Sequence, residues 1–72
     1  MQTIEIIKQI TADKTKQKRH PTHALFYEVL RIAESYYPVS AKEIIQADIK
    51  ELEKDGIIET GPTQNDTYIR LT

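Results

Sequence analysis

The sequence has 72 residues, of which 39% are hydrophobic and 29% are charged. A chain of this length can form one domain with one small core. It contains no cysteine, which excludes disulfide bonds and thiolate metal sites. No stretch is long and apolar enough for a membrane span, and Glu5 and Lys8 interrupt the N-terminal apolar run that a secretory signal would need. We therefore expect a single domain over residues 1–72 of a cytoplasmic protein.

Charge is distributed unevenly along the chain. The net charge is −1, but residues 14–31 hold five basic residues against one acidic residue, whereas residues 32–72 hold four basic residues against eight acidic ones. Proteins that bind nucleic acids concentrate positive charge on the contact surface, because neutralising phosphates supplies most of the non-specific affinity. Only the segment "KTKQKRH", residues 14–20, has such a concentration. It either contributes contacts to a nucleic-acid backbone or forms a solvated linker between helices.

Two helices are predicted in the first half. Over residues 3–16 the isoleucines recur at the 3.6-residue spacing of a helix, and Thr3 can cap its start. Residues 22–36 carry a broad apolar face, with Thr22 as N-cap, which indicates a central helix that contacts both of the others. Pro38 ends this helix because the residue before a proline is pushed out of the α region.

A third helix is predicted over residues 40–55. The segment "SAKE" matches a capping box, in which the side chains of Ser40 and Glu43 each bond to the amide of the other residue. Gly56 supplies the left-handed residue that closes the end of the helix. The carboxylates of Asp48 and Glu51 are expected to be solvated on its polar side.

After Gly56 the pattern changes to that of a β-hairpin. Residues 57–60 and 67–71 are rich in β-branched and aromatic residues, and the turn formers "GPTQND" connect them. Ile69 and Leu71 share one face of the second strand. Because a lone hairpin is marginal in water, this one must lie against the helices. The predicted fold class is mainly α with a small β-hairpin (α+β).

A family resemblance rests on the segment "DIKELEKDGIIETGPTQNDTYIRLT". It resembles the second half of a winged-helix (winged helix-turn-helix) DNA-binding domain, where a recognition helix ending in "LxxLExxGxI" is followed by a hairpin wing and a closing strand. The residues that match are Ile49, Leu52, Glu53, Gly56, Ile58 and Leu71. The resemblance implies a three-helix bundle with a C-terminal two-stranded wing. All matching residues except Glu53 are structural, so they indicate fold better than function.

Two alignments with this family are open for the upstream half. In the first, "HALFYEVLRIAES" is the first helix of the domain, and the family's second and third helices are fused into residues 40–55. In the second, the helices at 22–36 and 40–55, joined by "YYPV", form the helix-turn-helix. In both, no arginine lies at the start of the recognition helix to grip a guanine.

Our first functional hypothesis is a small DNA-binding protein, acting as a transcription regulator or as an accessory factor of a mobile element. The helix at 40–55 would enter the major groove of double-stranded DNA, and the wing would approach phosphates or the minor groove. The candidate DNA-binding residues are Lys42, Gln46 and Lys50 on the helix, Thr63, Gln64 and Asn65 in the wing, Arg70 on the last strand, and Lys16, Lys18 and Arg19 as backbone contacts.

The alternative is a winged-helix scaffold that binds another protein without binding DNA. The net acidic charge of the helix at 40–55 motivates it, because such a surface repels phosphates. A homodimer formed through the first helix is compatible with both hypotheses. No enzymatic motif is present and no cofactor is implied. His20 and His23 lack a third nearby ligand of the Cys or His type, so we expect no metal site.

Overall fold

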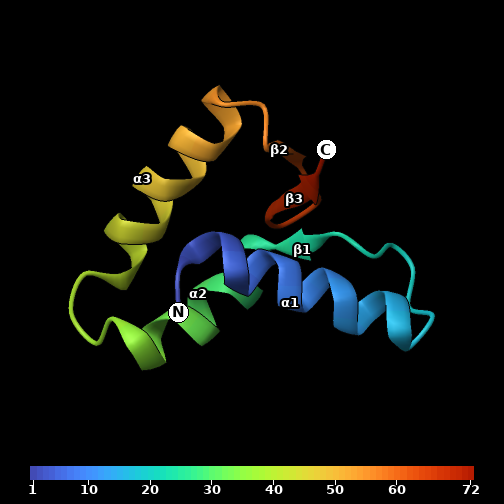
Figure 1. Ribbon diagram of the computed structural model, residues 1–72, viewed down its shortest axis with the longest axis horizontal. Coiled ribbons are helices and arrows are strands. Elements are labelled where there is room, and N and C mark those ends of the chain that lie inside the picture. The colour runs from blue at the N-terminus through green and yellow to red at the C-terminus, as the bar shows by residue number, and fades with distance from the viewer.

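The computed structural model describes residues 1–72 as an α+β domain of three helices and a three-stranded antiparallel sheet (Figure 1). In chain order the elements are α1 (Thr3–Lys16), β1 (Ala24–Leu25), α2 (Phe26–Tyr36), α3 (Ala41–Lys54), β2 (Ile58–Pro62) and β3 (Thr67–Leu71). The predicted α+β class is confirmed. None of the helices has the length and apolarity that crossing a membrane requires.

Strand β1 occupies the place of the predicted first turn of the second helix. We predicted that this helix begins after Thr22 as its N-cap, but it begins at Phe26, and the N-cap position is taken by Leu25 with an extended backbone. Leu25 donates its N–H to the Glu28 carboxylate at 2.9 Å. The prediction was wrong because helical spacing is a local signal, whereas this two-residue strand is held by pairing with β3 at the other end of the chain.

The strand order is β1-β3-β2, so β3 is the central strand of the sheet. Its Ile69 lies opposite Ala24 of β1 and Thr60 of β2. Ile69 and Ala24 are completely buried, as is expected for the face of the sheet that packs on the helices. Strand β2 is longer than predicted and extends to Pro62, and the hairpin loop is closed by a bond from the Thr63 N–H to the Asp66 carbonyl at 2.8 Å.

The core is small and consists of ten buried hydrophobic residues. The largest that are completely buried are Ile6 and Ile7 of α1, Ile45 of α3, Ile69 of β3 and Val29 of α2. Burying a side chain of this size stabilises the fold by about 1.5–3 kcal/mol. All three helices and the sheet therefore share one core, and no element packs independently of it.

A partly buried hydrogen bond joins the start of α1 to the middle of α3. The Thr3 hydroxyl donates to Asp48 Oδ2 at 2.6 Å, and Thr3 is only 2% exposed. The prediction that Thr3 caps α1 was wrong, since the N-cap is Gln2, whose N–H donates to Glu5 Oε1 at 3.0 Å. The expectation that Asp48 is merely solvated was also wrong, because it faces α1 across this contact.

The end of α1 is joined to α2 by an ion pair with little exposure to solvent. Lys14 belongs to the basic segment of the sequence, yet it is only 7% exposed. Its Nζ lies 2.6 Å from Glu28 Oε1 and donates to the His23 carbonyl at 3.0 Å. This lysine is therefore a structural residue that ties α1 to β1 and α2.

The two ends of α3 differ in how well they follow the sequence pattern. Gly56 adopts φ +75°, and the Ile57 N–H donates to the Leu52 carbonyl at 2.9 Å, which closes the helix as predicted. At the start, Ser40 adopts φ +66° and its side chain makes no capping bond. The predicted capping box is wrong because the hydroxyl reaches the helix amides from an extended backbone and not from a left-handed one.

Helix α1 ends in the same motif as α3, but with Lys18 where α3 has glycine. Lys18 adopts φ +57°, and the Arg19 N–H donates to the Lys14 carbonyl at 2.8 Å. A left-handed backbone strains a residue that carries a Cβ atom, so this helix end is less favourable than that of α3.

We predict that Lys18→Gly raises the free energy of unfolding by about 1 kcal/mol, because glycine removes this strain. The matched substitution Gly56→Ala should lower it by about 1 kcal/mol. Nothing lies within 4 Å of a Cβ added at Gly56, so the effect there reports the backbone alone. Urea denaturation followed by circular dichroism measures both. Equal stability of the parent protein and Lys18→Gly would contradict the prediction.

Candidate nucleic-acid interface

A groove of about 660 Å³ separates α3 from the tip of the β2–β3 hairpin. Gln46 and Lys50 line it from α3, and Asp66 and Thr67 line it from the hairpin. Phe26, at the start of α2, also lines it. Because side chains four residues apart share one face of a helix, Gln46 and Lys50 project from the same side of α3. The structure thus brings two of the predicted helix residues beside the hairpin.

Lys42 continues this stripe one helical turn earlier. It is four residues before Gln46 and is exposed, but it does not line the groove. The stripe of α3 therefore extends from the groove toward the start of the helix, where it is open to solvent.

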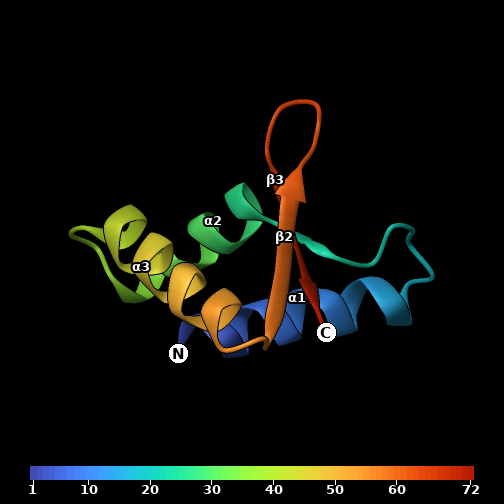
Figure 2. The same cartoon turned by 90° about the horizontal axis from the view of Figure 1, so that it is seen from above.

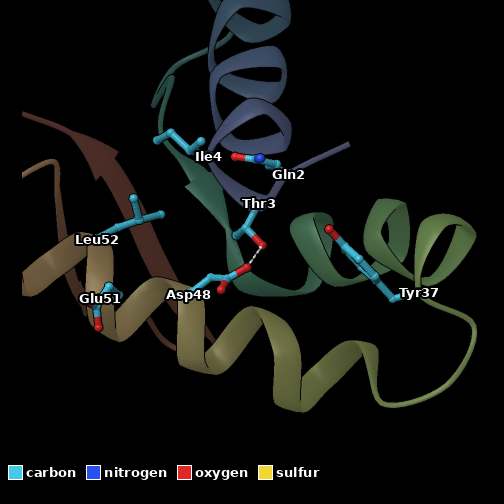
Figure 3. Close-up of a pocket in the computed structure, with 7 residues that line it drawn as sticks. All are labelled: Gln2, Thr3, Ile4, Tyr37, Asp48, Glu51 and Leu52. Atoms are coloured by element: carbon cyan, nitrogen blue, oxygen red, sulfur yellow. Dashed lines mark hydrogen bonds between the residues drawn. The ribbon is translucent and has the colours of Figure 1, made fainter.

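The acidic residues near the middle of α3 lie on a different side of the helix. Asp48 and Glu51 line a hollow of about 240 Å³ together with residues at the start of α1 and with Tyr37 (Figure 3). Asp48 points toward Thr3, to which it is hydrogen-bonded. Lys50 is the one charged residue that α3 contributes to the groove lining, so the α3 side of the groove does not carry the net acidic charge of the helix.

The hairpin loop projects away from the helices (Figure 2). Thr63, Gln64 and Asn65 are exposed at its tip. They line a second groove, of about 590 Å³, on the β1 side, together with His23 and Tyr27. The tip of the hairpin therefore stands between two grooves, one shared with α3 and one shared with the segment before α2.

Asp66 holds the hairpin loop against α2. Its Oδ2 accepts the Tyr27 N–H at 3.1 Å, and its Oδ1 accepts the Thr67 N–H at 2.8 Å. A carboxylate at the first turn of a helix is also favoured by the helix dipole. The sequence analysis treated this residue only as a turn former, and no local signal shows that its partner is the start of α2.

Arg70 is not part of either groove. It lies on the face of the sheet opposite to Ile69, and its guanidinium forms an exposed ion pair with Glu59 Oε1 at 2.9 Å. The ring of Tyr68 on the same face covers Gly61, where an added Cβ would come within 2.3 Å of it. The His23 ring packs beside Tyr68 with the ring centroids 5.0 Å apart.

The remaining basic candidates lie far from α3. Lys16 and Lys18 are exposed at the C-terminal end of α1, and that end and α3 occupy opposite ends of the long axis, with the hairpin between them (Figures 1 and 2). Arg19 lines another hollow, smaller than the one beside Asp48, together with His20 and His23. The predicted site residues therefore form two groups on either side of the hairpin rather than one continuous patch.

The two histidines do not form part of a metal-binding constellation. No group of three or more histidine, cysteine or acidic side chains has an arrangement that could hold a metal ion.

No family model, curated protein or solved structure matches this chain. The function proposed below therefore rests on the geometry of the predicted site residues on either side of the hairpin.

We predict that Asp66→Ala releases the hairpin loop from α2. Amide exchange at Tyr27 should accelerate, and the free energy of unfolding should fall by about 1 kcal/mol, because the two hydrogen bonds that the carboxylate accepts from Tyr27 and Thr67 near the surface are lost. Hydrogen exchange followed by NMR measures the amide directly. The control Asn65→Ala, in the same loop, should leave Tyr27 unchanged. Unaltered exchange of Tyr27 in Asp66→Ala would show that the contact does not hold the loop.

Proposed function

We propose that this chain has a winged-helix fold and binds double-stranded DNA, with α3 in the major groove and the hairpin loop acting as a wing. The observation that carries the proposal is the placement of Gln46 and Lys50 beside the hairpin tip, while Asp48 and Glu51 lie on another side of α3. A surface that combines a helix and a projecting loop can follow the edge of a groove and the adjacent backbone.

The topology supports the fold part of the proposal. Three helices followed by a two-stranded hairpin, with the third helix leading directly into the hairpin, is the arrangement that the resemblance implies. Helices α2 and α3 are separate and are joined by residues 37–40. Helix α1 shares one core with both of them through Ile6, Ile7 and Ile10, which makes it the first helix of the bundle. This supports the alignment in which α2 and α3 form the helix-turn-helix over the one in which α2 is the first helix of the domain.

The side chains on α3 favour backbone contacts over base recognition. Lys42 and Lys50 can neutralise phosphates, and Gln46 is the one amide on the stripe that could bond to the edge of an adenine. No arginine lies on α3. We therefore expect low sequence specificity, as in an accessory DNA-binding factor, with the exposed polar side chains of the loop contacting phosphate oxygens.

A protein-binding scaffold is the second candidate, and two observations favour it. The Asp66 carboxylate lines both grooves at the hairpin and would repel a phosphate that approaches there. Arg70 is paired with Glu59 rather than available to DNA. A chain of this kind would present the same grooves to another protein.

Fluorescence anisotropy with a labelled duplex of mixed sequence separates the two candidates. For about four phosphate contacts, DNA affinity should fall roughly a hundredfold between about 50 and 200 mM salt. Lys50→Gln and Lys42→Gln should each weaken binding and reduce the slope of log affinity against log salt by about 0.9. Lys8→Gln removes an exposed lysine of α1 that lines no groove, and it should do neither.

Absence of association at the lower salt concentration would reject DNA binding and leave the scaffold. Equal losses in Lys8→Gln and Lys50→Gln would also reject the proposed surface, because they would show that only net charge matters.

A further inference from the structure

The hollow at Arg19, of about 210 Å³, lies between the end of α1 and the start of α2. Half of its lining residues belong to the segment that connects α1 to β1, and that segment lies on the side of the hairpin away from α3 (Figure 2). The charged or titratable side chains that line it are Lys14, Arg19, His20, His23, Tyr27 and Glu28. Lys14 and Arg19 outnumber the single acidic residue, Glu28, which makes this the most basic of the hollows in the molecule.

The acidic residue of the hollow is already compensated. Glu28 Oε1 accepts both the Lys14 ammonium at 2.6 Å and the Leu25 N–H at 2.9 Å. An ammonium group has three N–H donors, and Lys14 uses the other observed one on the His23 carbonyl. One N–H of Lys14 is therefore left without a protein acceptor. The charge that remains in the hollow is that of the Arg19 guanidinium.

The backbone fixes the groups that carry this charge. Arg19 follows the left-handed Lys18, and its N–H is bonded to the Lys14 carbonyl at 2.8 Å, so the start of its side chain is held at the end of α1. His23 precedes β1 and its ring packs beside Tyr68 of β3. Arg19 and His23, near the two ends of the segment that connects α1 to β1, thus line one hollow.

From these observations we infer that the hollow binds a phosphate group, which either a small phosphorylated molecule or a DNA backbone supplies. A guanidinium binds phosphate oxygens with two parallel hydrogen bonds, and histidines and a lysine can complete the contacts. The volume is below the roughly 300–1,000 Å³ of sites for drug-sized ligands, so it suits one phosphate group rather than a whole nucleotide. The inference does not depend on DNA binding by α3.

Titration of the ¹⁵N-labelled protein with inorganic sulfate, a dianion at every pH used, tests the site. Saturable amide shifts should be confined to the segment that surrounds the hollow, and Arg19→Gln should weaken binding about tenfold through the loss of a charge-assisted bidentate contact. The control Lys8→Gln, which removes an exposed lysine of α1 that lines no hollow, should bind sulfate like the parent protein. Shifts that scatter over all lysines without saturation, or an unchanged affinity in Arg19→Gln, would overturn the inference.

Two small ligands distinguish the sources of the phosphate. Methyl phosphate carries the charge of a phosphorylated metabolite, whereas dimethyl phosphate is a singly charged diester like the DNA backbone. Tighter binding of the monoester supports a free phosphorylated ligand, and equal or tighter binding of the diester supports the backbone. If neither ligand competes with sulfate, the hollow is not a phosphate site. Loss of DNA binding in Lys50→Gln without loss of sulfate binding would keep this inference separate from the proposed function.

Discussion

The pairing of β3 with both other strands is the constraint on which the remaining structure depends. Its Ile69 is completely buried and lies opposite Ala24 on one side and Thr60 on the other. Through this one strand the segment before α2 and the hairpin are both fixed to the helical core. The pairing with β1 also brings His23 beside Tyr68, and the pairing with β2 sets the hairpin loop next to α3. The two candidate binding surfaces are consequences of that geometry.

Polar contacts between distant segments decide which charged side chains remain free for a ligand. Asp48 is bonded to Thr3, and Lys14 is paired with Glu28, so neither of these two residues acts as a simple surface charge. The Asp66 carboxylate accepts a hydrogen bond from the Tyr27 N–H at the start of α2. The candidate side chains of the two surfaces make no such contacts. They are Lys42, Gln46, Lys50, Thr63, Gln64 and Asn65 on the stripe and loop tip, and Arg19, His20 and His23 at the small hollow.

The sequence predicted those features that depend on local patterns. The helical spacing of the isoleucines in α1, the glycine after α3 and the alternation in β3 each report a preference of neighbouring residues, and the structure follows them. Strand β1 could not be predicted because two residues have no periodicity and their partner is remote. The left-handed Ser40 was missed because its pattern fits a capping box equally well. For the candidate site, the stripe on α3 was predictable from its spacing. The partner of Asp66 and the burial of Lys14 were not, because both depend on contacts between segments that are distant in the sequence.

The account stands on one surface that combines α3 with the hairpin loop, held in place by β3. Mapping the amide shifts of the ¹⁵N-labelled protein during titration with a short DNA duplex tests this most directly. The account predicts that Gln46, Lys50 and the loop residues 63–65 shift together, with the same dependence on duplex concentration, while the hollow beside Asp48 stays unchanged. Shifts confined to α3 or to the loop alone, or centred on Asp48 and Glu51, would contradict it.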